Sequence, residues 1–179
     1  IMDGILRKLP IGIQTFEKLR EGDYLYVDKT ALVWRIASTE TPYFLSRPRR
    51  FGKSLLLSTF EAYFEGKKEL FEGLAIADME KEWKTYPVFH LDLNAEKYDS
   101  PQALVEILSR QLTQWELKYG KGEDEETLSG RFAGVIRRAS EQADRGVVVL
   151  VDEYDKPLLQ ALDDGALLDD YRKTLKAFY

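Results

Sequence analysis

Residues 147–153 read Val147-Val148-Val149-Leu150-Val151-Asp152-Glu153, an apolar run that ends in two carboxylates. An apolar run of this length is typical of a strand that is buried on both faces of a parallel sheet. In open α/β sheets, ligands bind beyond the carboxyl ends of the strands. We therefore expect Asp152 and Glu153 to leave the sheet at its ligand-binding edge, in the Walker B arrangement.

Strand and helix patterns alternate before this segment, and a helix pattern follows it. We expect further strands at residues 43–46 and 88–93, and helices at 53–65, from 101 onward, at 128–139 and near the C-terminus. The last of these helices carries an apolar stripe at Leu167, Tyr171, Leu175 and Phe178. This order predicts an α/β layered domain with right-handed crossovers.

A second motif follows the first of these strands and matches the end of a phosphate-binding loop. Gly52 would let the backbone approach phosphate oxygens, and Lys53 would reach the β- and γ-phosphates. Ser54 would bind magnesium, while the first amides of the helix donate to the phosphates. The whole candidate loop comprises Arg47, Pro48, Arg49, Arg50, Phe51, Gly52, Lys53, Ser54 and Leu55.

The loop departs from the usual pattern, because Arg47 stands where the first glycine of G-x-x-x-x-G-K-[ST] is expected. Read alone, the motif therefore leaves open a basic turn that caps a helix. The arginines also leave open a solvated charge cluster or a local nucleic-acid contact. The Walker B pattern in the same α/β chain favours the phosphate-binding interpretation.

The two motifs together predict a site for ATP and Mg²⁺. Asp152 would hold the magnesium shell, and Glu153 would polarise the attacking water as a general base. Lys53 and Glu153 are thus the predicted catalytic residues, and Ser54 and Asp152 the predicted metal ligands. His90 shares a strand face with Asp92, and we interpret it as a hydrogen-bonded structural residue.

Three segments resemble the AAA-ATPase-like family of predicted ATPases, which is common in bacteria. The resembling segments are Tyr26-Val27-Asp28-Lys29-Thr30, then Phe44-Leu45-Ser46-Arg47-Pro48-Arg49-Arg50-Phe51-Gly52-Lys53-Ser54, and Val151-Asp152-Glu153-Tyr154-Asp155-Lys156-Pro157. The resemblance begins at Leu9-Pro10-Ile11-Gly12 and covers the rest of the chain. Members of this family have an arginine-proline-arginine loop in place of the first glycine.

The resemblance implies a three-layer P-loop NTPase fold of the ASCE/AAA-like type, with a mainly parallel sheet between helices. It assigns Lys53 and Ser54 to nucleotide and magnesium, and Asp152 and Glu153 to the acidic pair. In related ATPases, the segment that matches Tyr26 to Thr30 lies near the adenine. The resemblance favours adenine over guanine as the base. The chain also lacks the Asn-Lys-x-Asp motif that reads guanine.

We interpret residues 1–179 as a single P-loop ATPase domain, with an N-terminal extension at 1–40 and a nucleotide-binding core at 41–179. The family pattern continues with another strand, sensor residues and often a PD-(D/E)XK nuclease-like domain. We therefore expect the core to be incomplete at its C-terminus and the chain to be part of a longer protein. Hydrolysis by the fragment itself is expected to be weak or absent.

The favoured function is an ATP- and Mg²⁺-binding ATPase module that acts on a C-terminal nuclease-like effector and reaches nucleic acid through it. Two alternatives remain open: a degenerate P-loop scaffold for protein interaction, or a nucleic-acid-binding module that uses the arginine-rich loop. A homo-oligomer is compatible with the sequence, which does not indicate an oligomeric state.

Composition limits the other classes of function. The 179-residue chain has a formal net charge of −5, which argues against a surface that attracts nucleic acid throughout. It has no cysteine and one histidine, so disulfides, thiol chemistry and a zinc site are disfavoured. No apolar run reaches the roughly 18 residues that a membrane span needs, and the N-terminus lacks a signal-peptide pattern. We expect a cytoplasmic protein without membrane partners.

Overall fold

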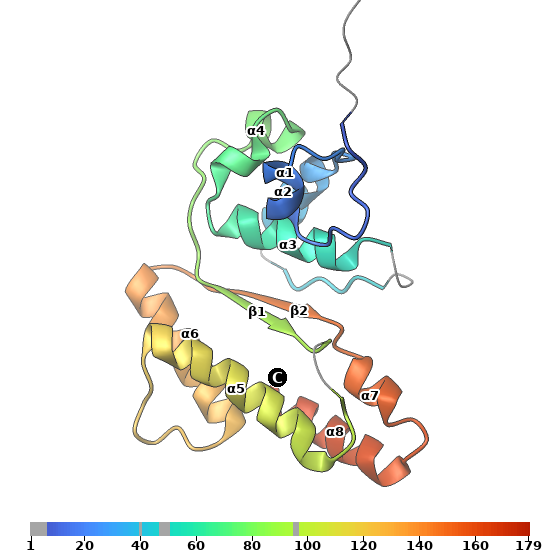
Figure 1. The fold of residues 1–179 in the computed structure, drawn as a ribbon. Coiled ribbons are helices and arrows are strands. Elements are labelled where there is room, and N and C mark those ends of the chain that lie inside the picture. Colours follow the sequence, from blue (N-terminus) through green and yellow to red (C-terminus); the bar gives the residue numbers. More distant parts are fainter. Residues whose placement is uncertain (1–6, 40, 47–50, 95–96) are drawn as a thin grey trace, which may run out of the picture. The chain divides into compact units, whose positions relative to one another are not determined.

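The structure, a computed structural model, describes residues 7–39, 41–46, 51–94 and 97–179. The chain divides into two compact units, which we call the N-terminal unit (Ile1–Thr85) and the C-terminal unit (Tyr86–Tyr179). Each unit has its own hydrophobic residues and its own set of helices (Figure 1). The prediction of a single domain with a boundary near residue 40 stays a prediction.

Short helices build the N-terminal unit. They are α1 (Phe16–Glu21), α2 (Thr30–Ala37), α3 (Lys53–Phe64), the 3₁₀ helix η1 (Lys68–Phe71) and α4 (Ala75–Met79). Phe16 and Phe71 are fully buried and their ring centroids lie 4.8 Å apart. Trp83 packs on Phe71 with ring centroids 5.2 Å apart. The aromatic rings therefore form the centre of this small core.

The expected strand at residues 43–46 does not form. Residues 41–46 have no regular secondary structure, and Tyr43, Phe44 and Leu45 are exposed. A strand requires a neighbouring backbone that accepts and donates hydrogen bonds. The described part of the N-terminal unit provides no strand as a partner, so the apolar pattern alone does not make this segment a strand.

The C-terminal unit contains the expected parallel pair of strands. Its elements are β1 (Val88–Asp92), α5 (Pro101–Tyr119), α6 (Leu128–Ala143), β2 (Val148–Asp152), α7 (Lys156–Gln160) and α8 (Gly165–Phe178). The two strands run parallel, with Val88 opposite Val148 and Asp92 opposite Asp152. Two α-helices thus connect them, as parallel pairing requires a long crossover. The strands, the helices and the apolar stripe of α8 agree with the sequence predictions.

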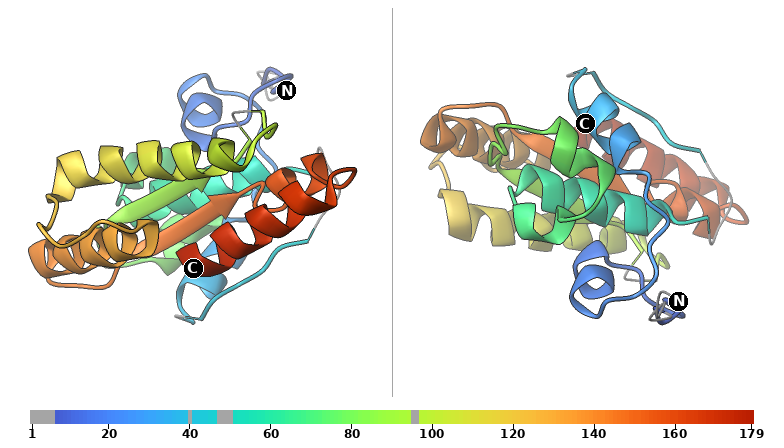
Figure 2. Two further views of the ribbon diagram at one scale, coloured as in Figure 1. Left: turned by 90° about the horizontal axis from the view of Figure 1, so that it is seen from below. Right: turned by 90° about the horizontal axis from the view of Figure 1, so that it is seen from above.

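Three helices cover one face of this sheet. Phe89, Leu91 and Leu93 of the first strand segment point into a core that they share with residues of α5, α6 and α8. Figure 2 shows these helices, in yellow-green, orange and red, lying across the two strands. Trp115 of α5 contacts Phe89 with ring centroids 4.9 Å apart, so it too is a packing residue. Full burial of each such side chain stabilises the fold by about 1.5–3 kcal/mol.

The ends of these helices follow from local sequence. Pro101 opens α5, as expected, because its missing amide would be unsatisfied there in any case. Ser100 precedes it without a side-chain cap, and its carbonyl instead accepts a hydrogen bond of 2.7 Å from the Tyr171 hydroxyl. The Thr127 hydroxyl caps α6, and the Asp164 carboxylate caps α8.

The described residues thus form a mixed α/β structure with a small parallel sheet of two strands. This sheet agrees with the α/β class, whereas a three-layer arrangement would need helices on both faces of a wider sheet. Within the part of the chain that the structure describes, no helix is both long and apolar enough to cross a membrane.

Candidate functional site

The start of α3 has the geometry of a phosphate-binding helix end. Gly52 adopts φ 75° and ψ 25°, a left-handed conformation that glycine reaches without the cost of a Cβ. Its carbonyl accepts the amide of Leu56 at 3.0 Å, so helical bonding begins at this residue. Among the described residues, no side chain caps this end of the helix. The first-turn amides of Lys53 and Ser54 are therefore available to a ligand.

Packing against α1 fixes the direction of α3. The backbone amide of Phe16 donates to Ser58 Oγ at 2.9 Å, and Ser58 in turn donates to the carbonyl of Leu55 at 2.9 Å. Thr59, which is buried, donates to the same carbonyl at 2.8 Å. These contacts hold α3 about one turn after Lys53 and Ser54, and none of them uses the first-turn amides.

Four of the predicted loop residues lie outside the described residues: Arg47, Pro48, Arg49 and Arg50. The described remainder of the loop comprises Phe51, which is 63% exposed, and the start of α3 from Gly52 to Leu55. The assignment of nucleotide contacts to all nine loop residues stays a prediction.

Asp28 links two helices of the N-terminal unit. Its Oδ1 accepts the amide of Thr30 at 2.8 Å and the hydroxyl of Thr30 at 2.7 Å, while its Oδ2 accepts the amide of Ala75 at 2.7 Å. Burial alone would raise the pKa of Asp28, but the hydrogen bonds from Ala75 and Thr30 lower that pKa below its usual value. The buried Thr30 hydroxyl accepts the amide of Ile76 at 3.1 Å. This part of the motif Tyr26–Thr30 therefore connects α2 to α4.

In the C-terminal unit, the carboxyl ends of both strands carry aspartates. Asp92 and Asp152 are partners in the parallel ladder, and Asp152 is buried whereas Asp92 is exposed. Asp152 Oδ1 accepts the amide of Glu153 at 2.9 Å, and the carbonyl of Asp152 accepts the amide of Leu93 at 3.1 Å. We call Asp92, Asp152 and Glu153 the acidic edge.

Glu153 has a left-handed backbone, with φ 51°. Residues other than glycine avoid this region, which costs roughly 1–2 kcal/mol. Two hydrogen bonds hold Glu153 there: its amide binds the Asp152 carboxylate, and its carbonyl accepts the amide of Lys156 at 3.0 Å. Strained residues of this kind cluster at functional sites.

Two side chains of α7 tie the segment after β2 to the segment after β1. Lys156 Nζ donates to the carbonyl of Asn94 and, at 2.6 Å, to Asn94 Oδ1. Gln160 Oε1 accepts the amide of Tyr98 at 3.1 Å. Neither contact was predicted, although Lys156 stands in the motif that ends at Pro157. Asn94 carries no signal in the sequence that would mark it as a partner.

The chain matches the profile of the family described as predicted AAA-ATPase over residues 10–179. It belongs to this family. A curated relative, described as an uncharacterized protein in the vnfD 5′ region of Azotobacter chroococcum mcd 1, is 41% identical over 174 residues. That alignment covers 97% of this chain and 34% of the relative, so the chain spans about a third of the relative's length. No solved structure matches the chain.

Because the chain belongs to the predicted AAA-ATPase family, Mg²⁺ is the first metal to compare with the residues present. Across the described ranges, no three histidine, cysteine, aspartate or glutamate side chains cluster so that they would hold an ion by themselves. Mg²⁺ differs from metals that need such a cage, because it retains waters and is bound through one or two carboxylates together with substrate phosphates. Serine hydroxyls and aspartate carboxylates are hard oxygen donors that fit this ion. Ser54 belongs to the N-terminal unit and Asp152 to the C-terminal unit, and their assignment as joint ligands of Mg²⁺ stays a prediction.

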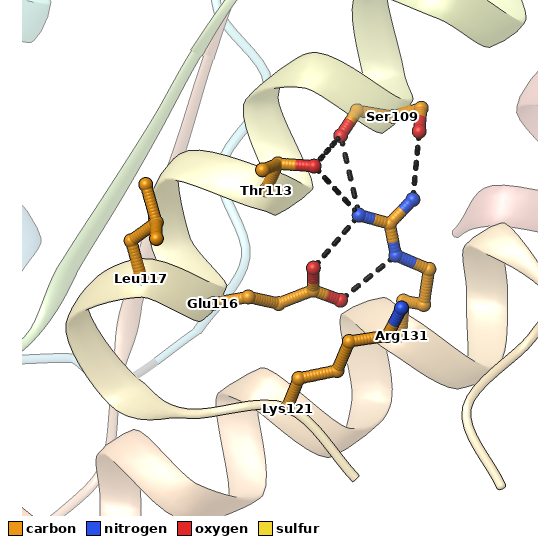
Figure 3. Close-up of a pocket in the computed structure, with 6 residues that line it drawn as sticks. All are labelled: Ser109, Thr113, Glu116, Leu117, Lys121 and Arg131. Carbon is orange, nitrogen blue, oxygen red and sulfur yellow. Dashed lines mark hydrogen bonds and ion pairs between the residues drawn. The ribbon is translucent and has the colours of Figure 1, made fainter. Parts of the chain in front are cut away.

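This predicted AAA-ATPase also has a polar cluster between α5 and α6, away from the acidic edge. The Arg131 guanidinium binds both oxygens of Glu116 at 2.8 Å and donates to Ser109 Oγ at 2.7 Å and to Thr113 Oγ1 at 2.9 Å (Figure 3). The hydrogen bond from Arg131 lowers the pKa of Glu116 despite its burial. Lys121 and Leu117 line the same hollow.

The dashed lines of Figure 3 join the Arg131 guanidinium to Glu116, Ser109 and Thr113, three residues of α5; we call these four residues the Arg131 cluster. Its chemistry therefore fits a structural role, in which one ion pair joins α5 to α6. The two partners lie on different helices, so sequence spacing gave no signal of this pair.

Proposed function

We propose that the chain is the ATP- and Mg²⁺-binding module of an ATPase with a P-loop NTPase fold of the three-layer ASCE/AAA-like type. The observation that supports the proposal best is the start of α3, where left-handed Gly52 precedes Lys53 and Ser54 at a helix end that no described side chain caps. Helix N-termini bind phosphate through free amides and the helix dipole. Membership of the predicted AAA-ATPase family supports the same reading.

Each predicted residue then has a chemical role. The Lys53 ammonium neutralises the β- and γ-phosphates, and the backbone amides at the start of α3 orient them. Ser54 and Asp152 are the protein ligands of Mg²⁺, which, when bound, neutralises charge on the phosphates. Glu153 orients the attacking water and accepts its proton. The contact between the Glu153 amide and Asp152 Oδ1 sets the backbone of the proposed base.

Hydrolysis by the full-length protein tests these roles. We expect Glu153→Gln to lower kcat by roughly 10²–10⁴-fold, as removal of a general base does, while Mg²⁺–ATP still binds. Asp152→Asn should raise the Mg²⁺ concentration needed for half-maximal binding of ATP. Unchanged hydrolysis in both variants would refute the assignment of the acidic edge, and a folded wild type without any ATP binding would refute the proposed function as a whole.

We also propose that ATP binding or hydrolysis controls a nuclease-like effector in the remainder of the protein, and that nucleic acid is reached through that effector. The length of the Azotobacter relative, of which the chain covers 34%, leaves room for such a region. The test is cleavage of DNA or RNA by the full-length protein with ATP, with a non-hydrolysable analogue and without nucleotide. Cleavage that is absent, or the same in all three conditions, would contradict this coupling.

A further inference from the structure

Hydrogen bonds close a ring around the acidic edge, and Lys156 is part of that ring. Asp92 Oδ1 accepts a hydrogen bond from the amide of Asn94 at 2.8 Å, and both oxygens of Asn94 accept hydrogen bonds from Lys156 Nζ. The amide of Lys156 donates to the carbonyl of Glu153 at 3.0 Å. The Glu153 amide binds Asp152 Oδ1, which completes the path from one aspartate of the ladder to the other.

Among the described residues, the Lys156 ammonium is the side-chain group that donates to Asn94 in this ring. The ladder ends at Asp92 and Asp152, and in the described part of the segments after them the one further ladder-type hydrogen bond runs from the amide of Leu93 to the carbonyl of Asp152. The Lys156 ammonium supplies the side-chain connection at Asn94, because it has several donors and can bind two acceptors at once. The same residue holds the carbonyl of left-handed Glu153 through its backbone amide.

From this geometry we propose that Lys156 is a positioning residue of the ATPase site. Its ammonium fastens the segment after β1, and with it Asp92, to the turn that carries Glu153. The inference rests on the proposed function, in which Asp152 holds the magnesium shell and Glu153 is the base. Lys156 acts on the reaction through its contacts with Asn94 and Glu153.

A control exists within the same helix. Gln160 also ties α7 to the segment after β1, but through Tyr98, outside the ring. Replacement of Gln160 therefore removes a side-chain connection between the same two segments and leaves the path from Asp92 to Asp152 intact. A general loosening of α7 would affect both positions, whereas a positioning role is specific to Lys156.

The test compares Lys156→Met, Asn94→Ala, their double variant and Gln160→Leu in the full-length protein. We expect Lys156→Met to lower kcat for ATP hydrolysis at least tenfold, with the Kd of Mg²⁺–ATP within twofold of wild type. Asn94→Ala keeps the backbone acceptor and should lower kcat less. The double variant should be no slower than Lys156→Met, since both changes break the same connection. Gln160→Leu should leave kcat within twofold.

Hydrogen exchange keeps the inference testable if the wild type hydrolyses no ATP. In that case the proposed ATP hydrolysis fails, but faster exchange at the amides of Asn94 and Glu153 in Lys156→Met, and not in Gln160→Leu, would still support the ring. Three results would overturn the inference: wild-type kcat in Lys156→Met, a Kd that rises as much as kcat falls, or unchanged exchange at Asn94 and Glu153.

Discussion

Asp92 and Asp152 are direct partners in the parallel ladder of β1 and β2, so both strands end on an aspartate at the same edge of the sheet. The two carboxylates have different surroundings, because Asp152 is buried and Asp92 is exposed. The buried residue binds the amide of Glu153, while the exposed one binds the amide of Asn94. One ladder position thus organises both segments that leave the sheet.

The left-handed conformation of Gly52 can be tested by the addition of one methyl group. A Cβ at this position would meet no atom of the described residues within 4 Å, so we expect Gly52→Ala to cost stability through its left-handed backbone at φ 75°. We expect the free energy of unfolding to fall by about 1–2 kcal/mol in urea titrations. Gly146→Ala is the matched control, since a Cβ there also meets nothing, and it should be neutral or slightly stabilising. Equal effects of the two substitutions would contradict the geometry at Gly52.

The left-handed backbone of Glu153 predicts an unusual order of stabilities. Glu153→Gly and Glu153→Ala both remove the carboxylate, but only glycine adopts φ 51° without a steric penalty. We expect Glu153→Gly to be more stable than Glu153→Ala by about 1 kcal/mol in thermal or urea unfolding. The reverse order, normal for most positions, would show that Glu153 does not hold this conformation in solution.

The ion pair of Glu125 with Arg138 predicts a dependence of stability on pH. Hydrogen bonds from Arg138, at 2.5 and 2.9 Å, lower the pKa of Glu125 from 4.5 to about 2. Because the folded-state pKa lies below the unfolded one, the stabilisation is complete above about pH 4.5 and is lost as the pH falls towards 2. Urea midpoints measured from pH 7 to pH 3 should therefore fall less steeply in Glu125→Gln than in wild type.

Glu123 provides the control for this pH effect, because it is an exposed carboxylate of the same loop. Glu123→Gln should follow the wild-type profile. A Glu125→Gln profile parallel to wild type over the whole range would count against the ion pair.

Among the ion pairs between described residues, the pair of Arg131 and Glu116 is the least exposed. Only 11% of the Arg131 side chain and 7% of the Glu116 side chain are exposed to solvent. Arg131→Met leaves Glu116 buried without its partner, and we expect a loss of about 3–5 kcal/mol in stability. The double variant Glu116→Met with Arg131→Met should lose less than Arg131→Met alone, because no uncompensated charge remains. Urea unfolding measures both values. Arg172→Met, which breaks an exposed pair with Asp169, is the control and should cost less than about 1 kcal/mol.

An additive result, in which the double variant is the least stable of the set, would contradict the account of the Arg131 cluster. It would mean that the two side chains contribute independently of each other.

The sequence predicted those helices and strands whose apolar residues follow the spacing of a buried face. The stripe of α8 names the residues that are buried in the structure, Tyr171, Leu175 and Phe178, because helical periodicity follows the side that faces the core. Both strands of the parallel pair were expected from their apolar residues. The segment 43–46 has a similar pattern but is no strand, since a pattern does not tell whether a neighbouring backbone is present.

The same distinction applies to the candidate site. The position of Gly52 before Lys53 and Ser54 at a helix start was predictable, because glycine followed by a helical pattern is a local signal. The left-handed backbone of Glu153 was not, since it depends on contacts with Asp152 and Lys156. Lys156 and Asn94 are far apart in the chain, and only the fold brings them together.

The proposed ATP site depends most directly on Lys53, which we expect to bind the phosphates of ATP. Calorimetric titration of the folded wild-type protein and of Lys53→Ala with ATP and Mg²⁺ tests it most directly. We predict saturable binding by wild type and an affinity at least tenfold lower in Lys53→Ala, a change of about 1.4 kcal/mol or more. Equal affinities of the two folded proteins, or no binding by either, would contradict the account.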